Sequence, residues 1–217
     1  MTANGEDREA FAALLLRLRA RGIASRELVA ALESVPRRGF VPGAWQALAW
    51  SERMLPIECG EAIEGTDLQA TVINALEVQP GHRVLEVGTG TGYTAAVLAR
   101  LGGRVTTLER FATLSTQARA RFEALGVANV QARQADGANG LPAEGPFDRI
   151  VVWAAFDSLP RHFVDQLSSG GVMVAPIGPA EGKQALAKLT KTGSRFERND
   201  LGGVRLQPLA RGVAKAI

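Results

Sequence analysis

Apolar side chains recur every three or four positions in the first forty residues, a spacing that predicts two amphipathic helices. The first apolar stripe begins near Phe11 and ends at Gly22. The second follows Ser25, a residue type that caps helix N-termini, and stops at Pro36, which cannot continue a helix. Residues 42–56 have a proline at each end and predict irregular chain.

A third helix is predicted before the pattern changes. Thr66 is followed three residues later by Gln69, the spacing of a capping box, and apolar residues continue at helical spacing to about Val78. We therefore expect Thr66 to cap a helix that ends near Val78.

From Pro80 onward, short runs of β-branched residues alternate with amphipathic segments, which predicts a parallel sheet with helices on both faces. Strands are expected at 83–87, 105–108, 130–133, 149–153 and 172–176, with helices around 93–101, 114–125 and 159–167. After Pro176 the alternation ends, and segments 185–191, 195–199 and 204–209 predict antiparallel strands at one edge of the sheet.

The predicted fold class is therefore α/β, a doubly wound, mostly parallel Rossmann-like sheet with antiparallel strands at one edge. Residues 1–79 are expected to form a helical extension that packs on the main domain, residues 80–217, within one structural domain overall. A chain of 217 residues with 46% hydrophobic content can bury one substantial core, which agrees with this division.

Composition narrows the location and the chemistry. No stretch approaches the roughly 20 apolar residues that span a bilayer, and residues 1–7 lack the order of a secretory signal, so we expect a cytoplasmic protein. The single cysteine, Cys59, cannot form an internal disulfide. With only His82 and His162 as imidazoles, no metal-ligand cluster has sensible spacing, and we expect no metal.

The charge balance gives little support for a nucleic-acid partner. The formal net charge is only +3. Six arginines fall between Arg17 and Arg38, but they alternate with Leu and Ala at helical spacing, and a solvated helix face explains that pattern better than a nucleic-acid surface does.

The residues most indicative of function lie at the end of the first predicted strand. Gly88, Gly90 and Gly92 follow Val87 and precede the next helix, which is the ligand position of an open α/β sheet. Glycines there let a bound molecule approach the backbone, and the helix N-terminus offers free N–H groups to an anionic group such as a carboxylate.

Two acidic positions extend this motif into a candidate pocket. Glu109 ends the next strand, where a carboxylate can accept hydrogen bonds from both hydroxyls of a ribose. Asp136 and Gly137 follow the third strand, where a carboxylate can receive the amine of an adenine. The alternative is a tight strand-helix turn with solvated acidic caps.

The spacing of the glycines favours one adenosine cofactor over another. An NAD fingerprint would place its last glycine at Tyr93, and the observed Gly92 comes one position too early. This spacing favours S-adenosylmethionine, and we expect NAD to bind poorly.

Several segments resemble the protein-L-isoaspartate O-methyltransferases, in order along nearly the whole chain. The matching segments are 35–42, 55–57, 83–110, 146–152, 170–178 and 204–209. The resemblance implies a Rossmann-like methyltransferase that transfers a methyl group from S-adenosylmethionine to the free α-carboxylate of an L-isoaspartyl residue in a protein or peptide. This reaction begins the repair of damaged asparagine and aspartate sites.

The resemblance also implies roles for the motif residues. The glycines at 88, 90 and 92 would line the methionine moiety, Glu109 would hold the ribose, and Asp136 with Gly137 would flank the adenine. Glu86 would either contact the methionine ammonium or fix the glycine loop.

The acceptor side departs from the family pattern. The family reads Gly-Tyr-Gly-Gln-Thr-Ile-Ser where this chain reads Glu-Cys-Gly-Glu-Ala-Ile-Glu at 58–64, so Glu64 stands beside Ile63 at the family's serine position. After the fourth strand, Trp153 and Phe156 replace a threonine and a proline, in a loop that would face the acceptor. Two alternatives therefore stay open: a methyltransferase with a changed acceptor, a small molecule or RNA, and a non-catalytic S-adenosylmethionine-binding module.

Overall fold

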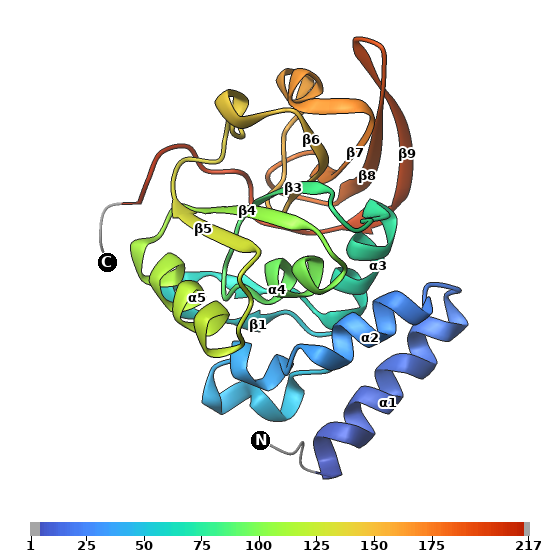
Figure 1. Ribbon diagram of the computed structural model, residues 1–217, viewed down its shortest axis with the longest axis vertical. Helices are drawn as coiled ribbons and strands as arrows, with labels where there is room; N and C mark the ends of the chain where they lie inside the picture. Colours follow the sequence, from blue (N-terminus) through green and yellow to red (C-terminus); the bar gives the residue numbers. More distant parts are fainter. Residues whose placement is uncertain (1–4, 215–217) are drawn as a thin grey trace.

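Within residues 5–214, which the computed structural model describes, seven strands form one sheet in the order β5-β4-β3-β6-β7-β8-β9 (Figure 1). The pairs among β5, β4, β3, β6 and β7 are parallel, and β8 and β9 pair antiparallel at the edge, as predicted. The strands are β3 (Arg83–Val87), β4 (Arg104–Glu109), β5 (Val130–Gln134), β6 (Phe147–Val152), β7 (Leu167–Ile177), β8 (Gln184–Thr192) and β9 (Arg195–Val204).

Five α-helices accompany the sheet in the described part of the chain. They are α1 (Gly5–Ala20), α2 (Arg26–Ser34), α3 (Thr66–Leu76), α4 (Tyr93–Arg100) and α5 (Ala112–Ala124). Ser25 caps α2 as predicted, because its side chain accepts a hydrogen bond from the Leu28 N–H. Between α2 and α3 the chain forms three short 3-10 helices, η1 (Arg37–Phe40), η2 (Gly43–Leu48) and η3 (Glu58–Gly60), and a two-stranded ribbon of β1 (Leu55–Pro56) and β2 (Ala62–Ile63).

The core has two parts because successive side chains of a strand point to opposite faces of the sheet. Val84 of β3 belongs to one buried cluster, and its neighbour Leu85 belongs to the other. The buried apolar residues of all five α-helices lie in the Val84 cluster, so α1 and α2 share a core with α3, α4 and α5. In Figure 1 these helices lie together on the lower side of the sheet.

The opposite face of the sheet is covered differently from the prediction. The helix expected around 159–167 is a short 3-10 helix, η5 (Arg161–Gln166), which contributes Phe163 to the second cluster. A 3-10 helix of this length buries only a short apolar segment, so loops cover the rest of this face.

Two local predictions were wrong. Thr66 is not a cap, because Gly65 occupies the N-cap position and the Thr66 hydroxyl donates to the carbonyl oxygens of Trp50 and Ser51 at 3.2 and 3.1 Å. A Cβ at Gly65 would lie 2.0 Å from the Glu52 carbonyl oxygen, so this close approach of two backbones excludes a capping side chain.

The strand expected at 204–209 is also absent from the described structure. β9 ends at Val204, and the following residues leave the sheet. Ala155, beyond the end of β6, donates its N–H to the Gln207 carbonyl and accepts from the Leu209 N–H. Pro208 lies between them and forms an isolated parallel bridge with Ala155 instead of part of a continued strand.

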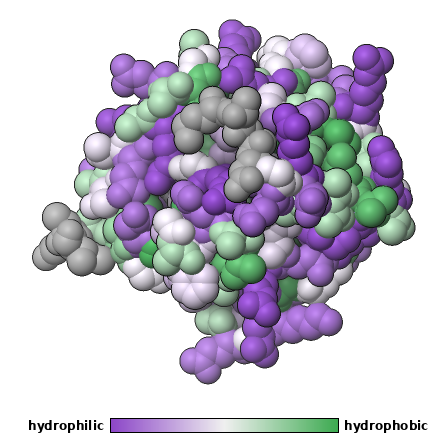
Figure 2. Space-filling view, turned by 90° about the horizontal axis from the view of Figure 1, so that it is seen from below, coloured by the Kyte–Doolittle hydropathy of each residue, from purple (hydrophilic) through white to green (hydrophobic). Residues whose placement is uncertain are grey.

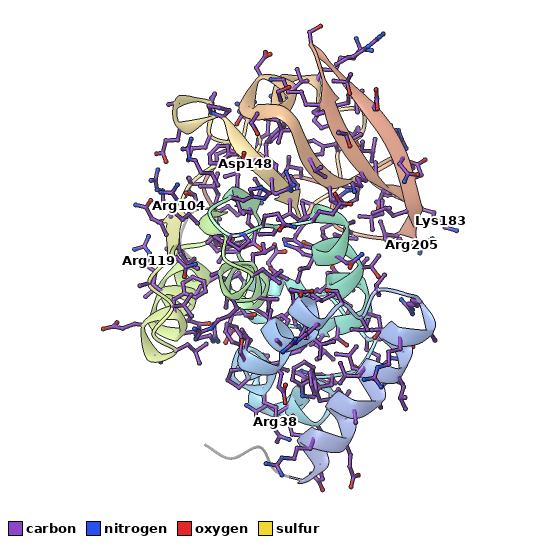
Figure 3. All side chains as sticks on the ribbon, turned by 45° about the vertical axis from the view of Figure 1, so that its right-hand side comes forward. Arg38, Arg104, Arg119, Asp148, Lys183 and Arg205 are labelled. Carbon is purple, nitrogen blue, oxygen red and sulfur yellow. The ribbon has the colours of Figure 1, made fainter. Side chains whose placement is uncertain are left out.

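Polar residues are spread over the surface. On the face shown in Figure 2, hydrophilic residues predominate and hydrophobic residues form separate groups. Figure 3 labels basic side chains on several sides of the molecule: Arg104 and Arg119 on one side, Lys183 and Arg205 on another, and Arg38 near the helical extension. Within residues 5–214, no helix is both long enough and apolar enough to cross a membrane.

The strand order places a topological switch point at β3. The chain passes from β3 to β4 on one side and returns to β6 on the other, so the carboxyl ends of these strands open a crevice. Gly88, Arg110 and Trp153 follow directly after β3, β4 and β6. The fold thus brings the predicted ligand loops to one edge of the sheet.

Candidate active site

The loop after β3 is fixed by hydrogen bonds to the neighbouring strand. The N–H groups of Gly88 and Thr89 both donate to the Leu108 carbonyl oxygen, at 2.9 and 3.2 Å. Gly88 and Gly90 have positive φ, and a Cβ at Gly88 would lie 3.1 Å from the Trp153 Cβ. Glycine is therefore required at this turn by both backbone conformation and space.

Glu109, at the end of β4, faces the same loop. One carboxylate oxygen accepts from the Gly90 N–H at 2.8 Å and the other from the Phe111 N–H at 3.0 Å. Burial raises its pKa, although these backbone N–H groups oppose the shift. A carboxylate has about four acceptor positions, so both oxygens can accept further hydrogen bonds from a ligand diol.

A cavity of about 750 Å³, partly open to solvent, lies between this loop and the chain's C-terminal segment. Of the predicted site residues, Gly88, Gly90, Glu109, Gly137 and Trp153 line it. Apolar walls come from several elements: Ile57, Val87, Leu108, Phe111, Leu114, Ala135, Pro208 and Leu209. Apolar walls beside one buried carboxylate suit an adenosine.

A second, smaller cavity of about 350 Å³ adjoins the first. Ala62, Gly88, Gly90 and Trp153 line both, so the two meet over the glycine loop. The remaining walls are mostly polar: Ile63, Glu64, Gln69, Thr89, Thr91, Tyr93 and Thr94. Among residues 5–214, the buried hydroxyls of Thr91 and Tyr93 have no hydrogen-bond partner, and the Arg37 guanidinium beside Tyr93 opposes the rise that burial causes in the pKa of the phenol. Buried polar groups are ordinarily paired, so these two point to a polar ligand or water.

Glu64 lines this second cavity and is half-buried. Burial raises the pKa of its carboxyl group to about 7, and the nearby Arg37 guanidinium opposes the rise. Ile63 lines the same cavity, and the expectation that these two residues face the acceptor stays a prediction.

Arg37 is fully buried and holds the backbone of Glu64, in the wall of the second cavity, in place. Its guanidinium donates to the Glu64 carbonyl oxygen at 2.6 Å and to the side chain of Gln69, and it lies 4.5 Å from the centre of the Tyr93 ring. Burial lowers its pKa to about 10, so the group stays cationic at neutral pH. The sequence did not identify Arg37 as a site residue, because Arg37 belongs to a group of arginines whose spacing predicts a solvated helix face.

Glu86 is completely buried and has the contacts of a loop-fixing carboxylate. It accepts hydrogen bonds from the Thr94 hydroxyl, from the Thr107 hydroxyl at 2.7 Å and from the Trp153 indole N–H at 3.1 Å. Burial raises its pKa to about 7 despite these donors. It lines neither cavity, and the alternative role, a contact with a methionine ammonium, stays a prediction.

Besides Glu86, three predicted residues lie outside both cavities. Gly92 is the N-cap of α4, where a Cβ would lie 2.8 Å from the Phe122 ring. Asp136 accepts from the backbone N–H groups of Ala138 and Gly212, at 2.9 and 2.8 Å, and so ties the C-terminal segment to the adjacent loop. Phe156 packs in the core against Phe163, with ring centres 5.6 Å apart.

Some lining residues were not predicted. Glu61 lines the larger cavity and is half-buried. Burial raises its pKa first, and the charge of Glu109 raises it further, while Arg110 opposes both. Residues 207–210 close the cavity from the C-terminal side. Pro208 was a usable signal against the predicted strand, but nothing in the sequence indicated which loop it would cover.

The joined cavities fit an adenosine that carries a polar amino-acid group. Gly88 and Gly137 pack tightly against cavity walls, since a Cβ at Gly137 would lie 2.4 Å from the Val87 side chain and one at Gly88 3.1 Å from the Trp153 Cβ. Glu109 supplies ribose acceptors, and the unpaired hydroxyls of Thr91 and Tyr93 can bind the charged end. The residues therefore satisfy the requirements of S-adenosylmethionine.

Comparison with known proteins agrees with this geometry. The sequence model of the protein-L-isoaspartate(D-aspartate) O-methyltransferase family matches residues 9–214. A protein-L-isoaspartate O-methyltransferase from Rhizobium meliloti (strain 1021) is 45% identical over 201 residues, which cover 93% of this chain and 98% of that protein. One of the same name from Azorhizobium caulinodans is 44% identical over 214 residues, 99% of each chain.

Solved structures show the same fold. A protein-L-isoaspartate O-methyltransferase structure has a TM-score of 0.80 at 26% identity and covers 94% of this chain and 67% of its own. A putative protein-L-isoaspartate O-methyltransferase from Plasmodium falciparum, in complex with S-adenosyl-L-homocysteine, has a TM-score of 0.77 at 23% identity. It covers 96% of this chain and 99% of its own.

The geometry of Glu109 makes a testable prediction about cofactor affinity. Glu109→Ala removes the acceptor for the Gly90 N–H and for a ligand diol, so binding of S-adenosylmethionine and S-adenosylhomocysteine should weaken about tenfold, within roughly 1–3 kcal/mol. Isothermal titration calorimetry measures both affinities. Glu123→Ala, at an exposed position on α5, is the matched control and should change neither. Affinities of Glu109→Ala within twofold of the wild type would remove the role we assign to Glu109.

Proposed function

This chain belongs to the protein-L-isoaspartate(D-aspartate) O-methyltransferase family of S-adenosylmethionine-dependent enzymes, and we propose that it methylates the free carboxylate of L-isoaspartyl residues in proteins. Family membership extends over almost the whole chain, including the C-terminal segment that closes the larger cavity. Relatives that carry the isoaspartate name share 44–45% of its residues.

The observation that carries the proposal is the meeting of two cavities over the glycine loop. One has the apolar walls and the buried carboxylate that an adenosine needs, and the other is polar. A donor that lies across the junction would present its reactive centre near Ala62, Gly90 and Trp153. An acceptor would reach that centre from the Ile63 and Glu64 side of the junction, beside the amino-acid part of the donor.

The reaction requires little acid-base chemistry from the protein. S-adenosylmethionine supplies a methyl group on a positively charged sulfur, and an isoaspartyl carboxylate is already ionised at neutral pH. The side chains therefore need only to bind the methyl donor and the acceptor, to orient them and to limit the access of water. Glu86 orients the Trp153 indole at the junction, and Arg37 holds the backbone at Glu64. No catalytic histidine or cysteine is required.

In this proposal the motif residues hold the cofactor as follows. Glu109 accepts from the ribose hydroxyls, Gly137 lies against the adenine, and the backbone at Gly88 and Gly90 lies along the methionine end. Asp136 does not contact the cofactor in this proposal. It accepts hydrogen bonds from Ala138 and Gly212, and so fixes the loop after β5 and the C-terminal segment, which contribute cavity walls.

A changed acceptor is the second candidate function, and Glu64 is the observation that favours it. A carboxylate in the polar cavity would repel an acceptor carboxylate: two charges about 4 Å apart repel by roughly 4 kcal/mol at an effective dielectric of 20. An uncharged or cationic acceptor would meet no such repulsion.

The direct test is methyl transfer to a defined peptide. Purified protein with labelled S-adenosylmethionine should methylate an L-isoaspartyl peptide and leave the matching aspartyl peptide unlabelled. The product should be a methyl ester, which alkali hydrolyses. Base-stable label, or equal labelling of both peptides, would instead support the changed acceptor.

A second prediction concerns the charge of Glu64. Because burial raises the pKa of Glu64 to about 7, the group is mostly ionised at pH 8.5 and mostly protonated at pH 6. Glu64→Ser should therefore lower the KM for the isoaspartyl peptide about tenfold at pH 8.5 and much less at pH 6. Steady-state kinetics at the two pH values measure this difference.

Glu64→Gln separates charge from shape, because it removes the charge and nearly preserves the volume. It should lower KM in the same way as Glu64→Ser. If the wild type methylates the peptide efficiently and neither substitution changes KM at pH 8.5, Glu64 does not face the acceptor.

A further inference from the structure

Three carboxylates surround the joined cavities. Glu61 and Glu109 line the larger cavity and Glu64 lines the smaller one. The described residues that line these two cavities include one cationic side chain, Arg110. Arg37 lies behind Glu64 and lines neither cavity. The charge balance of the walls is therefore negative when these groups are ionised.

Two of these carboxylates flank the junction of the cavities. Ala62 lines both cavities, and it lies directly after Glu61 and two residues before Glu64. The sulfur of S-adenosylmethionine connects its adenosine to its amino-acid part. With the adenosine in the apolar cavity and the amino-acid part in the polar one, the sulfur has to lie near this junction.

We propose that Glu61 and Glu64 make the site prefer cationic S-adenosylmethionine over its neutral product, S-adenosylhomocysteine. The two ligands share the adenosine and the amino-acid part and differ only in the methyl group and charge at sulfur. Carboxylates beside the junction attract the sulfonium and lose that attraction once the methyl group has left. The product is thereby released more readily.

The resemblance implies an uncharged glutamine and serine at these two positions, where this chain has Glu61 and Glu64. The proposal concerns cofactor binding alone. It therefore holds or fails independently of whether the acceptor is an isoaspartyl carboxylate.

The groups around each carboxylate set the pH at which the preference appears. Glu64 faces Arg37 from η1 and the Tyr93 phenol from α4. Glu61 faces Glu109 and Arg110 from the end of β4, with Glu58 and Cys59 on its own segment. Burial raises the pKa of Glu61 and raises that of Glu64 to about 7, so both bind protons more readily than usual.

The sign of the pH dependence follows from these shifts. A protonated carboxyl group gives the sulfonium no charge to attract, so the preference for S-adenosylmethionine should grow as pH rises through about 7. Binding of the cation should also release protons near pH 7, because it favours the ionised carboxylates.

Calorimetry of both ligands tests the proposal without an acceptor. The measured quantity is the ratio of Kd for S-adenosylhomocysteine to Kd for S-adenosylmethionine, from which shared contacts cancel. At pH 8.5, Glu61→Gln and Glu64→Gln should each lower this ratio about three- to tenfold, the effect of one charge several ångströms away in a partly hydrated site. Glu58→Gln is the matched control: Glu58 is exposed and lines neither cavity, so the ratio should not change.

Two further measurements keep the test independent of folding defects. The wild-type ratio should fall about three- to tenfold between pH 8.5 and pH 6, and Glu64→Gln should show a smaller fall. Sinefungin, which carries an ammonium group in place of the methylsulfonium, should follow S-adenosylmethionine in every variant.

Equal weakening of both ligands by the substitutions would overturn the proposal, because it would show that the carboxylates act on groups the ligands share. A wild-type ratio that does not change between pH 6 and pH 8.5 would overturn it for Glu64. If the wild type does not methylate the isoaspartyl peptide but the ratio of the two Kd values behaves as expected, only the proposed acceptor is contradicted.

Discussion

The buried carboxylate of Glu86 joins the segments from which the site is built. It lies on β3 and accepts hydrogen bonds from α4, from β4 and from the residue that follows β6. A carboxyl group removed from water is stable only when its oxygens are paired, and the three donors meet that requirement. Glu86 thereby holds the Trp153 indole beside the glycine loop, which the Leu108 carbonyl oxygen and Glu109 also fix, and both the loop and Trp153 bound the two cavities.

The two halves of the site differ in how closely they follow the family. The loop from Gly88 to Gly90 and the carboxylate of Glu109 form a cofactor cradle of the kind that the family resemblance implies. Glu61 and Glu64 place negative charge where the family has uncharged residues. Their charge acts in opposite senses on the two reactants, since it attracts a sulfonium and repels a carboxylate. In our proposals, the same two side chains therefore influence both the preference for S-adenosylmethionine over S-adenosylhomocysteine and the kind of acceptor that can bind.

Much of the fold and half of the site could be predicted from the sequence because those features depend on local patterns. β3 was predicted at its observed bounds, since a run of apolar residues before a glycine turn has few other structures. Gly88 and Glu109 were found because their spacing along the chain determines where they lie at the sheet edge. The roles in binding that we give to them remain proposals.

Other features depend on contacts between distant segments, which the sequence did not indicate. Gly65, and not Thr66, is the N-cap because the Glu52 carbonyl lies against it. Arg37 is buried because its guanidinium donates hydrogen bonds to the carbonyl oxygens of Ala49 and Glu64. Residues 207–209 were expected in a strand, yet together with Ala210 they cover the larger cavity. In each case a tertiary contact overrides the local preference.

A crystal structure of the protein with S-adenosylhomocysteine tests the central claim most directly, because that claim is the assignment of the two cavities to the two parts of one ligand. Our account predicts the adenosine in the larger cavity with its ribose hydroxyls on Glu109, the amino-acid part in the smaller cavity near Thr91 and Tyr93, and the sulfur beside Ala62. A ligand whose sulfur lies away from this junction, or whose ribose makes no contact with Glu109, would contradict it.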